Sequence, residues 1–152
     1  KRMQLFLDSS VILAAVGSQT GGSSHLFFLR LSKKLKLVSS RLVMWEVEKN
    51  VRKKFSEMHF ERFLMLSEQI KMLPEYPNEK IIKLAEQVII SKDAPMLADA
   101  KSSKSDILVT LDKKDMLQPK VHKFMKPIKI MTPGEVIKLV ESRPLQTIGS
   151  RL

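Results

Sequence analysis

Two short apolar runs, each followed by an aspartate, constrain the fold of this chain more than any other feature. Residues 3–7 are almost all apolar, and Asp8 follows them directly. Residues 107–109 are also apolar, and Asp112 comes three residues later. Runs of this kind are typical of strands that are buried on both faces, as in a parallel sheet. Because parallel strands end at one edge of a sheet, where ligands bind, we expect Asp8 and Asp112 to converge there.

Helical patterns separate the predicted strands, and several begin with a good capping residue. The clearest start is Thr132-Pro133-Gly134-Glu135, a capping box with proline in the first turn. Strands that alternate with helices predict an α/β fold, a three-layer α/β/α sandwich with a mostly parallel central sheet. The expected helices cover about residues 9–16, 24–36, 40–55, 57–73, 78–88, 93–103 and 133–141, and further strands cover 37–38 and 128–131.

Length and composition indicate one globular domain. The 152 residues suit a single core, with residues 1–141 as the domain and residues 142–152 as a loosely held C-terminal tail. The chain has no cysteine, which excludes disulfides and thiolate metal sites and suits a cytoplasmic location. The longest apolar run, residues 11–16, is far shorter than the roughly 20 residues that span a bilayer, so we expect no membrane partner and no export.

The net charge of +11 indicates an anionic partner such as nucleic acid. Two groups of basic residues flank the predicted site and are candidates for holding phosphates. These candidates are Lys49, Arg52 and Lys53 on one helix, and Lys113 and Lys114 after Asp112. Solvated helix faces explain the same residues almost as well, so charge alone does not decide the partner.

Further acids lie at the starts of helices or along them. Asp93 opens a helix, where the helix dipole is expected to keep its carboxylate ionised and to lower its pKa. Glu46 and Glu48 point about 200° apart on their helix, so only one of them can face a shared site. The apolar stripe of that helix passes nearer to Glu48. Asp99 and Asp115 are expected to be surface acids, with outer-shell contacts at the metal site as the alternative.

Four segments, taken in order, resemble the successive motifs of PIN-domain nucleases, the family of the VapC-like toxins. They are LFLDSSV at 5–11, EVEKNV at 46–51, KDAPMLADA at 92–100 and ILVTLDKKD at 107–115, and the closing strand and helix at 130–135 is also typical. The resemblance extends over about residues 3–139. It implies an α/β/α fold in which four acids bind Mg²⁺ or Mn²⁺ for phosphodiester hydrolysis.

Carried over residue by residue, the resemblance assigns these acids to Asp8, Glu46, Asp93 and Asp112. The resemblance selects Glu46, whereas the apolar stripe of the helix favours Glu48. Thr110 is the supporting hydroxyl, and Ser10 stands where many members carry asparagine but can still donate a hydrogen bond to Asp8. Leu111 stands where glycine is common.

The predicted function is therefore a Mg²⁺- or Mn²⁺-dependent nuclease, an endoribonuclease with RNA favoured over DNA as substrate. The toxin of a toxin–antitoxin pair is one role that fits this prediction. The alternative is a nucleic-acid-binding module that keeps the fold without hydrolysis. A phosphatase built on Asp8 is disfavoured, because it would need a second aspartate where Ser10 stands. The methionine-rich helix expected over residues 57–73 predicts a homodimer or inhibitor contact. Trp45, the only tryptophan, is expected to serve packing rather than base stacking.

Overall fold

The strands form one parallel sheet in the order β3-β2-β1-β4-β5. The computed structural model describes residues 2–32, 35–74 and 76–142. Leu5, Phe6 and Leu7 of the central strand are fully buried, as their apolar run predicts. The strand bounds are β1 (Met3–Leu7), β2 (Leu35–Ser40), β3 (Lys71–Leu73), β4 (Ile107–Val109) and β5 (Lys129–Met131).

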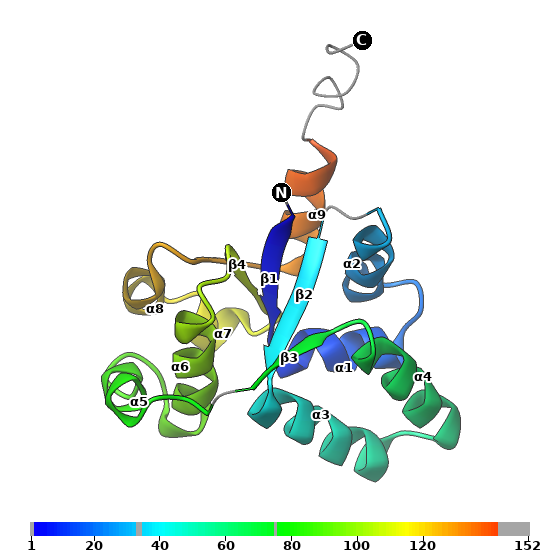
Figure 1. Cartoon of the computed structure of the whole chain (residues 1–152), viewed down its shortest axis with the longest axis horizontal. Coiled ribbons are helices and arrows are strands. Elements are labelled where there is room, and N and C mark those ends of the chain that lie inside the picture. The colour runs from blue at the N-terminus through cyan, green and yellow to red at the C-terminus, as the bar shows by residue number, and fades with distance from the viewer. Residues whose placement is uncertain (1, 33–34, 75, 143–152) are drawn as a thin grey trace.

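Helices cover both faces of this sheet, which confirms the predicted three-layer α/β/α sandwich (Figure 1). On one side α1 (Ser9–Gly17), α2 (Gly22–Arg30) and α9 (Pro133–Glu141) pack together. On the other side lie α5 (Glu79–Ala85), α6 (Ala94–Ser102) and α8 (Pro119–Met125). The remaining helical elements are α3 (Arg41–Lys54), α4 (Glu57–Ser67), the 3-10 turn η1 (Ser91–Asp93) and α7 (Lys113–Met116).

Side-chain caps fix the helix starts that matter for the site. The Ser40 hydroxyl accepts the N–H of Val43 at 3.1 Å, so α3 begins directly where β2 ends. Thr132 and Glu135 form the predicted capping box, with a hydrogen bond in each direction. The carboxyl ends of the central strands are therefore surrounded by helix starts whose positions are set locally.

The expected helix over residues 57–73 is wrong in its second half. The α4 helix ends at Ser67, whose hydroxyl bonds back to the carbonyl oxygen of Leu64 at 2.8 Å. Ile70 is then buried, and residues 71–73 pair with β2 as the edge strand β3. Methionines recur every seven residues as far as Met72, which is a helical interval. The open edge of β2, however, offers backbone hydrogen bonds that a longer helix cannot use.

Two expectations concern the ends of the chain and the membrane. The tail expected at 142–152 lies outside the described residues except for Ser142, so the division at residue 141 stays a prediction. Among the described residues, every helix is too short or too polar to span a bilayer.

Candidate metal centre

The register between β1 and β4 brings two candidate acids to the same edge of the sheet. Leu7 pairs with Val109, and the next N–H along β1, that of Asp8, donates to the carbonyl oxygen of Val109 at 3.0 Å. The two strands end at this pair, and the backbone leaves the sheet after each of them. Asp8 and the segment that carries Asp112 therefore emerge side by side, as the parallel arrangement predicts.

The carboxylate of Asp8 is buried, at 6% exposure, and accepts hydrogen bonds on both oxygens. Oδ1 accepts the N–H of Ser9 at 2.6 Å. Oδ2 accepts the hydroxyl of Ser10 at 3.0 Å and that of Thr110 at 2.7 Å. These bonds fix the orientation of the carboxylate and offset the cost of burying its charge.

The two hydroxyls also bind the turn that follows β4. The Ser10 hydroxyl accepts the N–H of Leu111 at 3.0 Å, and the Thr110 hydroxyl accepts the N–H of Asp112 at 3.0 Å. A hydroxyl has only one proton, and each of these protons is donated to Asp8. Asp8 and the turn at 110–112 are thus held in one network that joins the ends of β1 and β4.

Three carboxylates gather beside this network. Asp93, Asp112 and Asp115 each offer an oxygen, and these oxygens all lie within 4.8 Å of one another. Asp112 also caps α7, because its Oδ1 accepts the N–H of Asp115 at 3.1 Å. Asp115 is half-buried within this group, which agrees with the alternative of a contact at the metal site rather than with a plain surface acid. Its spacing of three residues from Asp112 at a helix start, which places both on one side, could have revealed it.

Asp93 contributes its carboxylate without using it as a cap. It stands at the N-cap position of α6, but its side chain makes no capping hydrogen bond. Burial is the main effect that raises its pKa, and Lys92 opposes this. The neighbouring charges of Asp8, Asp112 and Asp115 raise it further. The expectation of a lowered pKa is therefore wrong, because burial and the charges of three neighbouring carboxylates raise it.

The two glutamates of α3 lie on opposite flanks of the helix. Glu48 lines the groove between α3 and α4, and its carboxylate pairs with Arg52 at 3.0 Å. Glu46 is exposed on the other flank, and it is not one of the three described carboxylates that gather within 4.8 Å. Its assignment as a metal ligand stays a prediction, and so does the choice of Glu46 over Glu48.

Asp99 is a buried acid that the sequence did not reveal. It is 5% exposed on α6, so the expectation of a surface acid is wrong. Burial raises its pKa to about 6, although a hydrogen bond from the side chain of Ser40 acts in the opposite direction. Because Ser40 caps α3, Asp99 links α6 to the start of α3.

The candidate phosphate-binding residues lie on α3 and α7. Lys113 and Lys114 open α7 directly after Asp112. Lys113 is near enough to Glu135 that its charge helps to lower the pKa of that carboxyl, although a hydrogen bond from Thr132 is the larger cause. On α3, Lys49, Arg52 and Lys53 lie along the helix that carries Glu46, and their contact with phosphates stays a prediction.

The oxygens gathered at this sheet edge are a donor set that suits a hard divalent cation. Carboxylates about 4 Å apart repel each other by roughly 4 kcal/mol at an effective dielectric near 20, so the cluster is unfavourable without a counter-ion. Oxygen ligands favour Mg²⁺ or Mn²⁺ over softer metals. Burial is the main cause of the raised pKa of Asp93, and the charges of Asp8, Asp112 and Asp115 add to it.

The fold is thus a three-layer α/β/α domain whose acids gather where β1 and β4 end. A family model described as PIN domain matches residues 5–120, and the chain belongs to the PIN domain family. PIN domains are in general metal-dependent nucleases that use divalent ions.

Solved structures of low sequence identity share the fold. PAE2754 from Pyrobaculum aerophilum is 18% identical with a TM-score of 0.59, and the alignment covers 92% of this chain and 97% of that one. VapBC-1 from nontypeable Haemophilus influenzae is 20% identical with a TM-score of 0.59, covering 87% and 99%. VapBC2 from Rickettsia felis, solved with a DNA fragment from its promoter, is 16% identical with a TM-score of 0.63, covering 86% and 98%. No protein of curated function matches the sequence.

Proposed function

We propose that this PIN domain is an endoribonuclease that hydrolyses phosphodiester bonds with the help of Mg²⁺ or Mn²⁺. The observation that carries the proposal is the gathering of Asp93, Asp112 and Asp115 within 4.8 Å, with Asp8 near enough to raise the pKa of Asp93. Acids from separate elements that meet at the carboxyl edge of a parallel sheet are suited to a metal and a phosphate. Membership of the family supports the same chemistry.

The acids have distinct tasks in this proposal. Asp8, Glu46, Asp93 and Asp112 are the metal ligands and catalytic residues, with Asp115 as an additional ligand. A bound ion supplies Lewis acidity toward the phosphate and lowers the pKa of a water molecule. Ser10 and Thr110 keep the Asp8 carboxylate oriented by donating to its Oδ2. Lys49, Arg52, Lys53, Lys113 and Lys114 hold phosphates of the RNA.

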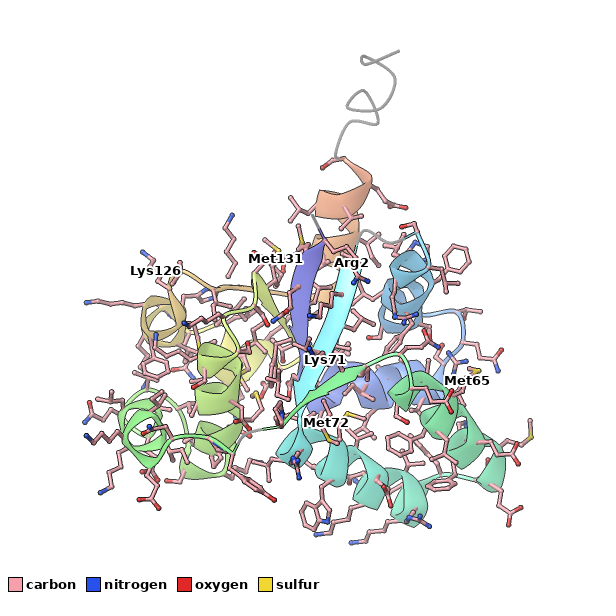
Figure 2. All side chains as sticks on the ribbon, in the orientation of Figure 1. Arg2, Met65, Lys71, Met72, Lys126 and Met131 are labelled. Carbon is pink, nitrogen blue, oxygen red and sulfur yellow. The ribbon has the colours of Figure 1, made fainter. Side chains whose placement is uncertain are left out.

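A protein partner is the second part of the proposal. Two of the similar structures are VapBC assemblies, which supports a toxin whose inhibitor or second copy binds through α4. Met58 and Met65 lie seven residues apart, on the same side of that helix, and are 78% and 49% exposed. Figure 2 labels Met65 on α4. Cysteine-free composition supports action in the cytoplasm.

One observation favours the rival function, a nucleic-acid-binding module without hydrolysis. Glu46, the acid carried over from the family motif, is exposed and not among the three gathered carboxylates. A module of this kind would bind RNA through its basic residues and would leave it intact, so cleavage assays separate the two functions.

Metal binding is expected to stabilise the folded protein. If only the folded state binds Mn²⁺, a concentration of 100 times the Kd stabilises that state by about 2.7 kcal/mol. This raises the Tm of a domain of this size by about 5 to 10 °C. Asp8→Asn should remove this increase, whereas Glu86→Gln, an exposed acid on the C-cap of α5, should keep it. Thermal melts across a metal titration measure the effect. No increase for the parent, together with no heat of binding in calorimetry, would rule out the metal centre.

RNA binding is expected to weaken steeply with salt, because the positive charges release counter-ions from the phosphates. The slope of log affinity against log salt should be about −0.7 for each phosphate neutralised on a single strand. Replacing both Lys113 and Lys114 with alanine should make the slope shallower by about 0.7 or more, the value for one phosphate. Binding to a single-stranded RNA is measured with chelator present at several salt concentrations. A slope near zero would show that the charge of +11 serves another purpose.

A further inference from the structure

An open apolar groove of about 860 Å³ lies between α3 and the segment formed by α4 and β3. Apolar side chains that usually pack in a core are exposed here, and Figure 2 labels one of them, Met72, on β3. Among the residues that line the groove are Leu42, Trp45, Phe63, Leu64, Met72 and Tyr76. The α4 helix contributes Phe63, Leu64 and Ser67 to the groove, whereas Met58 and Met65, the proposed partner contacts of that helix, are not among the lining residues.

The groove contains the only tryptophan and the only tyrosine of the chain, and both rings are largely exposed. Trp45 is 62% exposed and Tyr76 is 77% exposed, so the expectation that Trp45 serves packing is wrong. Each ring has a cation near its face. Lys49 Nζ lies 5.1 Å from the centre of the Trp45 ring, and the Arg41 guanidinium lies 5.7 Å from that of Tyr76.

The groove is also close to the candidate metal centre. Pro95 lines it and lies two residues after Asp93 in the first turn of α6. The α3 helix, which forms one wall, begins at the carboxyl end of β2. The groove and the candidate metal centre therefore adjoin the same first turn of α6.

Arg41 lines the groove, and Lys49 lies beside it over the Trp45 ring, so the charges on this side of α3 favour an anion. Arg41, Trp45, Lys49 and Arg52 follow one another at helical spacings of three or four residues, so they share one face of α3. The one acid of α3 that lines the groove, Glu48, is paired with Arg52. An apolar protein segment would have to remove water from Arg41 and Lys49 without replacing it, whereas a nucleic acid stacks bases on the rings and brings phosphates to the cations.

We infer that this groove is a base-binding subsite, in which unpaired bases of single-stranded RNA stack on Trp45 and Tyr76 while Arg41 and Lys49 contact the adjoining phosphates. The inference rests on the proposed function for the choice of RNA, and the subsite requires unpaired nucleotides, since paired bases have no free face to stack. A duplex of the same sequence should bind this groove poorly.

The fluorescence of Trp45 tests the inference directly, because no other tryptophan contributes. A single-stranded RNA of about 12 nucleotides, added with chelator, should quench the emission, whereas an abasic strand of the same length should not. Trp45→Ala should weaken RNA binding about tenfold or more, and Trp45→Phe should recover most of the loss. Phe28→Ala removes a ring of similar exposure on α2 and should leave binding unchanged.

Three outcomes would overturn the inference. They are equal quenching by the abasic strand, unchanged affinity in Trp45→Ala, and a concentration-dependent dimer that Trp45→Ala abolishes and RNA does not displace. The third would assign the groove to a second copy of the chain. Cleavage assays keep the two proposals apart. If the parent cleaves RNA but Trp45 takes no part in binding, the nuclease proposal stands and the subsite is wrong. If RNA quenches Trp45 but is not cleaved, the subsite stands and the nuclease proposal is wrong.

Discussion

Asp112→Asn is expected to lower metal-dependent RNA cleavage by at least about 10³-fold while RNA binding stays within a few-fold of the parent. A metal ion contributes several kcal/mol to the transition state of phosphoryl chemistry, and each 1.36 kcal/mol is a factor of ten in rate. Asp112 has one of the three oxygens that gather at the site, so its loss should remove most of this contribution. Binding is retained because the basic residues that contact phosphates are unchanged.

The measurement follows product lengths and affinity together in a mixed RNA pool with Mn²⁺. Chelator is the control for the metal, and Glu86→Gln is the control for loss of an acid elsewhere. If the Asp112→Asn variant still cleaves, the site is in the wrong place. If the parent shows no chelator-sensitive cleavage of RNA or DNA, the chain is a binding module.

Asp99→Asn is expected to make the protein more stable above pH 6 by up to about 3 kcal/mol, and to have little effect near pH 4. The pKa of Asp99 is raised from 3.8 to about 6 in the folded protein, and each pKa unit corresponds to 1.36 kcal/mol. Between these two values the folded state still holds a proton that the unfolded state has lost. The free energy of unfolding therefore falls as the pH rises from about 4 to about 6, and is then constant.

Asparagine cannot ionise but can still accept the hydrogen bond from Ser40. The free energy of unfolding of the Asp99→Asn variant should therefore lack the fall that ionisation of Asp99 causes. Urea denaturation of parent and variant at matched pH values gives the difference, in which the titration of all other carboxyls cancels. A difference that is the same at pH 4.5 and pH 7.5 would show that the burial of this carboxyl does not control the stability.

The sequence predicts the sheet and its central acid well, because both depend on local patterns. The apolar run of β1 identifies a strand buried on both faces, and the parallel arrangement then places Asp8 at its carboxyl edge. The capping box at Thr132 is equally local, since its hydrogen bonds join residues three apart. Each of these features can be read within a window of a few residues.

Features that depend on distant contacts were not predictable in this way. The β3 strand exists because β2 has an open edge, which no pattern within residues 71–73 reveals. Asp99 is buried by the packing of α6 near the start of α3, and the same acid on an unpacked helix would be exposed. Trp45 shows the opposite case, since nothing in the described structure covers the apolar groove in which it lies.

The hydrogen bonds around Asp8 have a consequence for when the candidate metal centre can first form during synthesis of the chain. Thr110 is 102 residues away from Asp8, so its hydroxyl can reach the carboxylate only after nearly the whole domain has been made. Until then the nascent chain also lacks Asp112 and Asp115, and a fragment ending before β4 holds a single member of the gathered carboxylates. Such a long-range closure is late in folding. A fragment that ends before β4 therefore cannot form the three-carboxylate cluster, so the candidate metal centre requires nearly the whole domain.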